Sequence, residues 1–276
     1  MQSLRTGAAR ARMVAVMVAM AVGGGVVSAP PAWARRPPTT TTTRATTTTV
    51  PSTTTTTTPT TTHTPGGYDI SWPQCGTSYP TNPAFGIVGA SNGLAYSDNP
   101  CLASEYAWAA MAARAPAFYV NTADPGSQST HWTTPGPKSC GGSSTDLGCA
   151  YNYGWNAVAH ALAYAAAQTA GATSDAWWLD IETANTWSTV TAVNNADIGG
   201  MVDYFHSRSL TVGVYSTSYQ WGQITGGASL AVPDWVAGAS SVSQASSWCT
   251  PSYSFTGGAV RLVQYPSGSF DGNVAC

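Results

Sequence analysis

Apolar and polar positions follow two different periods along residues 67–276. Short apolar runs bounded by Gly, Pro, Asn or Ser predict strands, and stretches whose apolar residues recur every three or four positions predict helices. The expected strands cover 68–71, 85–90, 117–121, 177–182, 211–216, 235–239 and 260–265. The expected helices cover 102–114, 155–170 and 192–207, and the second is rich in Ala, the best helix former.

This alternation of strands with helices is typical of parallel βαβ units, so the expected fold class is α/β, built as a barrel or as a doubly wound sheet. Polar side chains favour the barrel, because they gather in or at the carboxyl ends of the apolar runs, where barrel enzymes carry their chemistry. These residues are Asp69, Asn121, Asp180, Glu182, Ser216 and Gln264. We therefore expect a modified TIM-type (β/α) barrel over 67–276. The lack of a helical pattern after about residue 235 indicates that loops join its last strands.

The residues before 67 have a different character. Residues 1–34 read as a secretory signal peptide, with Arg residues before an apolar run over 13–27 and Ala-Trp-Ala at 32–34 as the cleavage pattern. An uncleaved anchor is the alternative, although the run is short for a span of about 20 residues. Residues 35–66 are mostly Thr and Pro, which bury too little apolar surface to fold, so we expect a disordered linker. Its hydroxyl groups make O-glycosylation a hypothesis.

Charge is distributed unevenly along the chain. The whole chain carries 10 Lys and Arg against 12 Asp and Glu, a net charge of −2. Six of the basic residues precede residue 45, so residues 67–276 hold 4 basic against all 12 acidic residues, 4 − 12 = −8. A nucleic-acid partner is not expected for such an acidic domain, which suits a neutral or polyhydroxyl ligand better than phosphate.

All 6 cysteines lie in residues 67–276. An even number behind a secretion signal indicates disulfides. Six cysteines allow 15 pairings, and proximity in the sequence favours Cys75–Cys101, Cys140–Cys149 and Cys249–Cys276. The cysteines and histidines lack CxxC and HxxxH spacings, so neither a metal site nor a cofactor is expected.

The strongest chemical signal is the pair Asp180 and Glu182 in the run Trp-Trp-Leu-Asp-Ile-Glu. Alternate residues of a strand share a face, so the two carboxyl groups point the same way. Because adjacent carboxylates repel, one keeps its proton to higher pH, and the pair offers an acid and an anion for cleaving a glycosidic bond. A calcium site or a solvated strand end is the alternative, and the spacing does not decide between retention and inversion.

Two more acids and several aromatic residues flank the expected strands. Asp69 ends the first strand and Asp271 follows the last. Barrel closure makes the first and last strands neighbours and would bring both acids to Glu182, whereas each alone is typical of a turn or cap. The Trp residues near strand ends either stack on sugar rings or pack in the core. They are Trp72, Trp178, Trp187, Trp221 and Trp235.

Six motifs occur in a recognisable order: Asp-Ile-Ser-Trp-Pro-Gln at 69–74, Leu-Asp-Ile-Glu-Thr at 179–183, Val-Gly-Val-Tyr-Ser-Thr-Ser-Tyr-Gln-Trp at 212–221, Asp-Trp-Val-Ala-Gly-Ala at 234–239, Leu-Val-Gln-Tyr at 262–265 and Phe-Asp-Gly-Asn at 270–273. With them, residues 67–276 resemble glycoside hydrolase family 25, the Ch-type lysozymes. More closely, they resemble secreted actinobacterial proteins with a family-25-like domain.

The resemblance implies a modified (β/α) barrel that hydrolyses the bond after N-acetylmuramic acid in peptidoglycan. Glu182 would be the general acid/base, and Asp180 would orient the substrate N-acetyl group as an internal nucleophile. Asp69 and Asp271 would support the site. Substrate contacts are expected from Trp72, Tyr119, Trp178, Tyr215, Trp235 and Gln264. The expected protein is a secreted or wall-associated monomer whose partner is peptidoglycan or a related N-acetylated glycan, with no membrane contact after signal cleavage.

The chain departs from the family pattern at three places. Gly89–Gly93 replaces Lys-Ala-Thr/Ser-Glu-Gly and loses both charges, Val120 and Asn121 stand where a His is usual, and the run from Trp235 lacks the usual Tyr of Trp-x-Ala-x-Tyr. The four acids are retained while the pocket wall changes. Two hypotheses follow: a hydrolase of peptidoglycan or a related glycan, and a non-catalytic glycan-binding protein on the same barrel.

Overall fold

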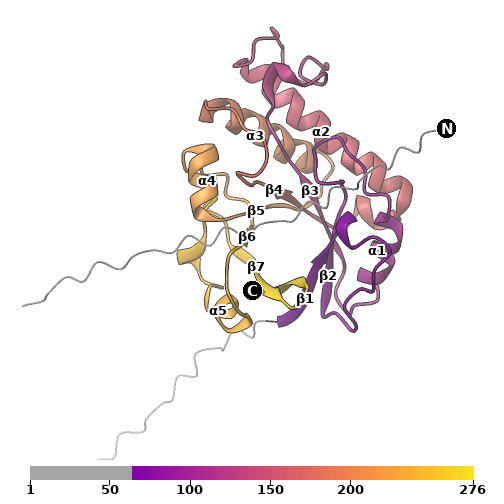
Figure 1. The fold of residues 1–276 in the computed structure, drawn as a ribbon. Coiled ribbons are helices and arrows are strands. Elements are labelled where there is room, and N and C mark those ends of the chain that lie inside the picture. The colour runs from indigo at the N-terminus through magenta and orange to yellow at the C-terminus, as the bar shows by residue number, and fades with distance from the viewer. Residues whose placement is uncertain (1–63) are drawn as a thin grey trace, which may run out of the picture. The chain divides into compact units, whose positions relative to one another are not determined.

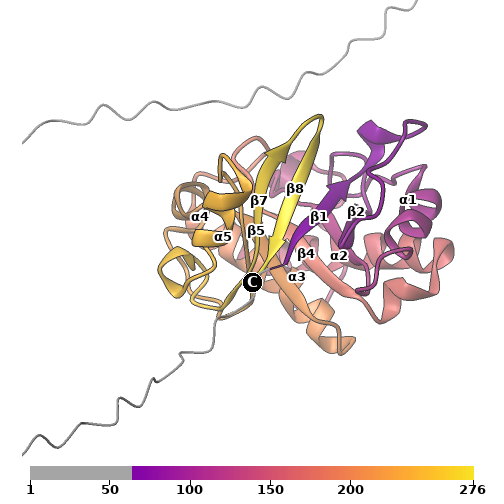
Figure 2. The same ribbon diagram turned by 90° about the horizontal axis from the view of Figure 1, so that it is seen from below.

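Eight strands close into one barrel in the computed structural model, which describes residues 64–276. The strands are β1 (Thr64–Ile70), β2 (Phe85–Gly89), β3 (Ala117–Asn121), β4 (Ala176–Asp180), β5 (Val212–Ser216), β6 (Asp234–Val236), β7 (Val260–Ser267) and β8 (Phe270–Ala275). Strands β1 to β7 pair in parallel, and β8 runs antiparallel between β7 and β1. Figure 1 looks along the barrel, and Figure 2 shows β7, β8 and β1 side by side.

Helices lie outside the barrel in Figure 1. The α-helices are α1 (Leu102–Ala109), α2 (Leu147–Gln168), α3 (Thr191–Ser207), α4 (Ser218–Thr225) and α5 (Val242–Ser247), and the 3₁₀ turns are η1 (Trp72–Gln74), η2 (Gly126–Gln128), η3 (Ala170–Thr173) and η4 (Pro251–Tyr253). The largest apolar core fills the space between the strands and these helices and includes Phe118 and Trp177. A second core lies where α5 covers β7 and β8.

The barrel interior changes character along its axis. Inward positions alternate along each strand, so Trp178 and Asp180 of β4 share the inner face. Around Trp178 the interior is apolar, with Phe85, Ile87 and Leu262 in the same cluster. The ring of Trp178 lies against Gly213, where any side chain would collide with it. The carboxyl end of the same interior is polar, and the site residues are found there.

The barrel predicted from the sequence is confirmed, and all seven expected strands are present with ends no more than four residues from those predicted. Strand β1 begins at Thr64, so the last three residues assigned to the linker belong to the barrel. Strand β8 was not predicted, because its inward positions carry the polar Asp271 and Asn273 instead of an apolar alternation. Asp271 therefore lies within a strand, not after the last one.

The connections differ from expectation in length and type. Helix α1 ends at Ala109, before the predicted residue 114, whereas α2 begins at Leu147 because the side chain of Asp146 caps it by accepting a hydrogen bond from the Cys149 N–H. Helices α4 and α5 were not predicted. Both are short, and α5 is polar, so neither shows a helical apolar period. The connection from β6 to β7 thus contains a helix where a loop alone was expected.

All three disulfides proposed from proximity are present: Cys75–Cys101, Cys140–Cys149 and Cys249–Cys276. The predicted signal peptide and all but the end of the predicted linker lie outside the described residues. Within residues 64–276, no helix combines the length and apolar character needed to cross a bilayer.

Candidate active site

Four acidic side chains meet at the carboxyl end of the barrel. Asp69 is the penultimate residue of β1, and Asp271 stands opposite it across the ladder to β8. Asp180 ends β4, and Glu182 lies two residues beyond it. Burial is the main cause that raises the pKa of each carboxyl group, and mutual repulsion adds to it: Asp271 acts on Asp69 and Glu182, and Asp69 acts on Asp180. The closed barrel brings together the four acids that the sequence singled out.

Asp180 and Glu182 are neighbouring carboxyl groups whose pKa values are both raised. Asp180 is 5% exposed, and burial, followed by the charge of Glu182, raises its pKa well above the usual range. Burial raises the pKa of Glu182, while the neighbouring side chains of Asp180 and Gln220 oppose that rise. The pair therefore combines one group that can give a proton with one that can receive it.

Asn121 holds Asp180 from the neighbouring strand β3. Its Nδ2 donates to Asp180 Oδ2 at 2.5 Å, and its Oδ1 accepts from Ser91 Oγ at 2.8 Å. The Ser91 hydroxyl also accepts the Asn121 backbone N–H at 2.9 Å, which fixes both side chains. Ser91 and Asn121 belong to two of the segments that depart from the family pattern. Neutral, hydrogen-bonded side chains thus line the wall where the family usually carries charged residues.

Asp69 accepts hydrogen bonds from two amides whose orientation is fixed. Asn273 Nδ2 donates to Asp69 at 2.6 Å, and Gln264 Nε2 donates at 3.1 Å. The indole N–H of Trp235 donates to Asn273 Oδ1 at 2.8 Å, and the Tyr215 hydroxyl donates to Gln264 Oε1 at 2.8 Å. These partners turn both amide N–H₂ groups toward Asp69. Burial and then the charge of Asp271 nevertheless raise the Asp69 pKa to about 7.

Tyr119 completes the inner wall beside the acids. Its ring lies against Gly89, where a Cβ atom would stand 2.8 Å from the ring. Burial, followed by the charge of Asp69, raises the pKa of the phenol well above its ordinary value. Burial and then the charge of Glu182 do the same for Tyr215. Both phenols are neutral hydrogen-bonding groups at any physiological pH.

The tryptophans divide between the site and the core. Trp72 is 40% exposed in η1, directly after β1. Trp187 is partly buried, and its indole N–H donates to the Glu182 backbone carbonyl at 2.8 Å. Trp178 and Trp235, expected to contact substrate, are 6% and 2% exposed and pack edge-to-face in the barrel interior. That expectation is corrected: an inward position in a filled barrel leaves no free ring face for a sugar. Trp221 is likewise buried.

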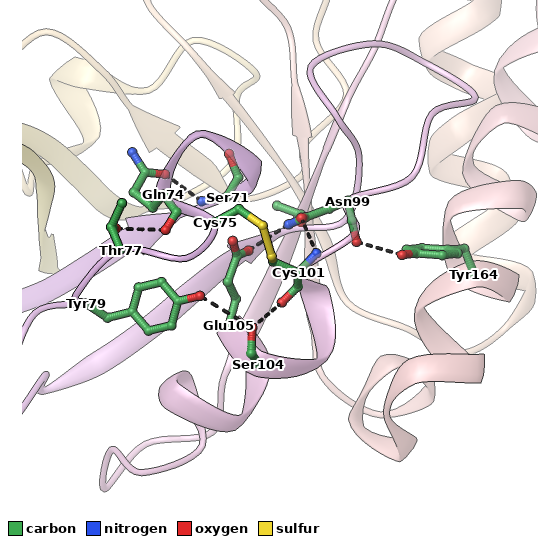
Figure 3. The surroundings of a disulfide bond; sticks show 11 residues. Ser71, Gln74, Cys75, Thr77, Tyr79, Asn99, Cys101, Ser104, Glu105 and Tyr164 are labelled. Atoms are coloured by element: carbon green, nitrogen blue, oxygen red, sulfur yellow. Dashed lines mark hydrogen bonds between the residues drawn. A yellow bond between two sulfur atoms is a disulfide. The ribbon is translucent and has the colours of Figure 1, made fainter.

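A disulfide anchors the turn that carries Trp72. Cys75 follows η1 and is joined to Cys101 at the start of α1 (Figure 3). The Gln74 side chain accepts the Ser71 backbone N–H at 2.9 Å, which closes the turn. Below it, buried Glu105 accepts from Asn99 Nδ2 at 2.6 Å, and burial raises the pKa of Glu105 to about 7. The position of Trp72 is therefore set by covalent and hydrogen-bonded links.

Sequence reasoning missed two contributors to the site. Gln220 in α4 lowers the raised pKa of Glu182, and its Oε1 accepts the Thr183 backbone N–H at 2.7 Å. Asn273 is fully buried and orients Asp69. Both residues lie in motifs that carried the family resemblance, so their presence in those motifs was the available signal. The sequence pattern did not reveal that α4 and β8 lie beside the acids.

One family model matches part of the chain. Residues 152–247 match the model of a family described as Lysozyme-like protein 1. This stretch runs from α2 to α5 and contains Asp180, Glu182 and Gln220. The resemblance to lysozymes that the motifs indicated is confirmed by this match. No curated protein sequence matches the chain.

Three solved structures are similar to the chain at low identity. The bacterial lysozyme from Streptomyces coelicolor is 18% identical, with a TM-score of 0.48 over 75% of this chain and 89% of that one. The modular Cpl-1 endolysin, solved with a peptidoglycan analogue, is 16% identical, with a TM-score of 0.45 over 76% of this chain and 53% of that one. The catalytic domain of endolysin ply40 from Listeria monocytogenes bacteriophage P40 is 14% identical, with a TM-score of 0.44 over 76% and 91%.

Proposed function

We propose that this protein is a secreted glycoside hydrolase that cleaves peptidoglycan as an N-acetylmuramidase. The observation that carries the proposal is the placement of Asp180 and Glu182, together with Asp69 and Asp271, at the carboxyl end of a closed barrel. A carboxylic acid next to a carboxylate is the equipment for glycosidic bond cleavage. The lysozyme-like family match directs the choice of substrate to peptidoglycan.

The spacing of the pair leaves the stereochemistry open. Inverting glycosidases hold their two carboxyl groups about 6.5–9.5 Å apart to admit a water molecule. Glu182 follows Asp180 by two residues at the end of β4, a backbone spacing of about 6.6 Å. This spacing does not distinguish the two stereochemical outcomes, so the attack by the substrate N-acetyl group is taken from the family resemblance.

In the proposed reaction, the proton of the pair is on Glu182 once the substrate is bound. Glu182 gives it to the glycosidic oxygen while the N-acetyl carbonyl oxygen attacks the anomeric carbon and the bond to the leaving sugar breaks. Asp180, then a carboxylate, accepts the N-acetyl N–H and orients the group. Glu182, now a carboxylate, removes a proton from the water that opens the cyclic intermediate, and so returns to its acid form. Asp69 and Asp271 stabilise the positive charge that develops on the sugar ring.

A second function is favoured by a specific observation. The wall formed by Ser91 and Asn121 is neutral where the family usually carries charge. A non-catalytic glycan-binding protein would keep the cleft and exposed Trp72 without turnover. The two functions differ in whether the acid pair is needed for product formation.

The deciding experiment is mass spectrometry of fragments released from purified peptidoglycan by the wild type, by Glu182→Gln and by Asp203→Asn. Asp203 is an exposed acid on α3 that accepts the Tyr151 hydroxyl, so its variant is a matched control. We expect muramic acid reducing ends from wild type and control, and a rate about 10²–10⁴-fold lower for Glu182→Gln. Sedimentation with the wall material but no products from any variant would instead establish the binding protein.

A further inference from the structure

A cavity opens at the end of the barrel opposite the acids. It has a volume of about 360 Å³, within the range of about 300–1,000 Å³ that is common for small-molecule sites. Its lining includes the first residues of β2, β3 and β4 and the last residue of the antiparallel β8, which places it at the amino end of the parallel strands. The apolar wall is formed by Phe85, Ile87, Trp178 and Leu262.

Two arginines flank this apolar wall. Residues 64–276 contain four Lys or Arg in all, and two of them, Arg114 and Arg261, line the cavity. Neither takes part in an ion pair within the described part of the chain. Asp175 also lines the cavity, and its carboxylate accepts the Tyr106 hydroxyl at 2.8 Å. In a domain with a large excess of acids, half of the positive side chains therefore gather at one cavity.

Arg114 is held in place over the opening. Its Nη2 donates to Thr64 Oγ1 at 2.7 Å, and its guanidinium lies 5.9 Å from the centre of the Phe85 ring. Arg261 is exposed on β7 next to Leu262, whose side chain points into the barrel. A guanidinium group offers several N–H donors in a planar fork that matches a carboxylate. Most of the donors of both arginines remain free for a ligand among the described residues.

We propose that this amino-end cavity binds an organic carboxylate with an apolar tail, such as a medium-chain fatty acid. The carboxylate lies between Arg114 and Arg261, and the tail lies in the cavity against Trp178 and Leu262. A neutral sugar would leave both charges and the apolar wall without partners, and a cation would be repelled. The inference stands apart from the proposed hydrolase function, because it uses none of the acids at the other end of the barrel.

The test is isothermal titration calorimetry of the full chain with octanoate as probe. Octan-1-ol has the same tail without the charge, and acetate has the charge without the tail. Arg114→Gln and Arg261→Gln each remove one guanidinium. Arg208→Gln is the matched control, because Arg208 lies over the Tyr204 ring at the end of α3 and away from the cavity. Trp178 reports on occupancy through the NMR shift of its indole N–H.

We expect saturable octanoate binding with a shifted Trp178 signal, at least tenfold weaker in Arg114→Gln and Arg261→Gln and unchanged in Arg208→Gln. Octanol and acetate should bind at least tenfold more weakly to the wild type. The inference is overturned by any of three results: no saturable binding of octanoate, binding of octanol with equal affinity, or the same affinity in all three arginine variants. The ligand comparison on the wild type decides even if a variant fails to fold.

Discussion

The two ends of the barrel interior are built from the same strands and have opposite chemistry. On β4, Trp178 and Asp180 are two residues apart on one face, yet the first lies in the apolar cluster and the second in the acid site. On β7, likewise, Leu262 lies in the apolar cluster and Gln264 lies in the acid site. The amino end buries aromatic rings between two arginines, and the carboxyl end holds four acids. Two residues, a distance of about 6.6 Å along a strand, therefore separate the apolar cluster from the acid site.

The apolar packing at the amino end allows the barrel to tolerate a cluster of mutually repelling acids. The raised pKa values of Asp69, Asp180 and Glu182 mean that their ionised forms are disfavoured in the folded chain. The apolar packing below them supplies stabilisation that does not depend on pH. The candidate active site therefore lies at one end of the barrel, and the pH-independent apolar packing lies at the other.

The largest effect is expected from emptying the amino end. Trp178→Ala removes a ring that packs against Trp235 and Gly213, and should lower the free energy of unfolding by about 3–5 kcal/mol. Urea unfolding at pH 7 measures the change, with Trp178→Phe as the control that keeps an aromatic ring and should lose less stability. In the fraction that remains folded, peptidoglycan cleavage per molecule should be retained. A loss of less than about 1 kcal/mol would show that the ring carries little of the stability.

Next in size are two disulfides that close loops of nearly equal length. The sequence separation is 26 residues for Cys75–Cys101 and 27 for Cys249–Cys276, so replacing either pair with Ser should lower stability by a similar amount, about 2–4 kcal/mol. Only the first pair anchors the turn that carries Trp72. We expect its removal to weaken glycan binding, measured as a higher KM at a temperature where both variants are folded. Equal KM values would remove the link between this disulfide and the site.

A smaller effect concerns pH. Because the folded pKa of Asp69 is about 7 and the unfolded value is 3.8, the folded chain binds the extra proton between these values. The contribution of Asp69 to stability is therefore present below about pH 4 and is lost as pH rises toward 7. In Asp69→Asn, melting temperature should fall less between pH 4 and 7 than in the wild type. Parallel pH profiles for the two proteins would contradict the raised pKa.

The smallest effect is expected at the rim. Trp72 is exposed, so Trp72→Ala should change the free energy of unfolding by less than about 0.5 kcal/mol. If the ring stacks on a sugar, KM should rise by the equivalent of about 0.5–1.5 kcal/mol with kcat unchanged. Steady-state kinetics on soluble peptidoglycan fragments measure this, and Trp72→Phe should recover part of the loss. An unchanged KM would assign substrate contact to other residues.

The sequence predicted those features that a local pattern records. Seven strands show short apolar runs, α2 and α3 show a helical period, and three disulfides follow from proximity. Asp180 and Glu182 stand out because charged residues interrupt a run that is otherwise apolar. Strand β8 was not predicted, since the polar residues that it contributes to the site dominate its pattern. Helices α4 and α5 were missed because short helices in such positions carry little apolar period.

Chain order and side-chain type therefore determined the barrel, the acid pair and the likeness to lysozymes. Only the tertiary structure decided which inward residues meet the site and which are buried beneath it. The strand period of two residues places Trp178 and Asp180 on the same face of β4. It does not determine how deep each side chain lies along the barrel axis. Depth depends on how neighbouring strands are staggered, and on β8 returning antiparallel between β7 and β1 with Asp271 and Asn273 at its start. Those relations join residues about 200 positions apart, such as Asp69 and Asn273 with a separation of 204, and no local pattern encodes them.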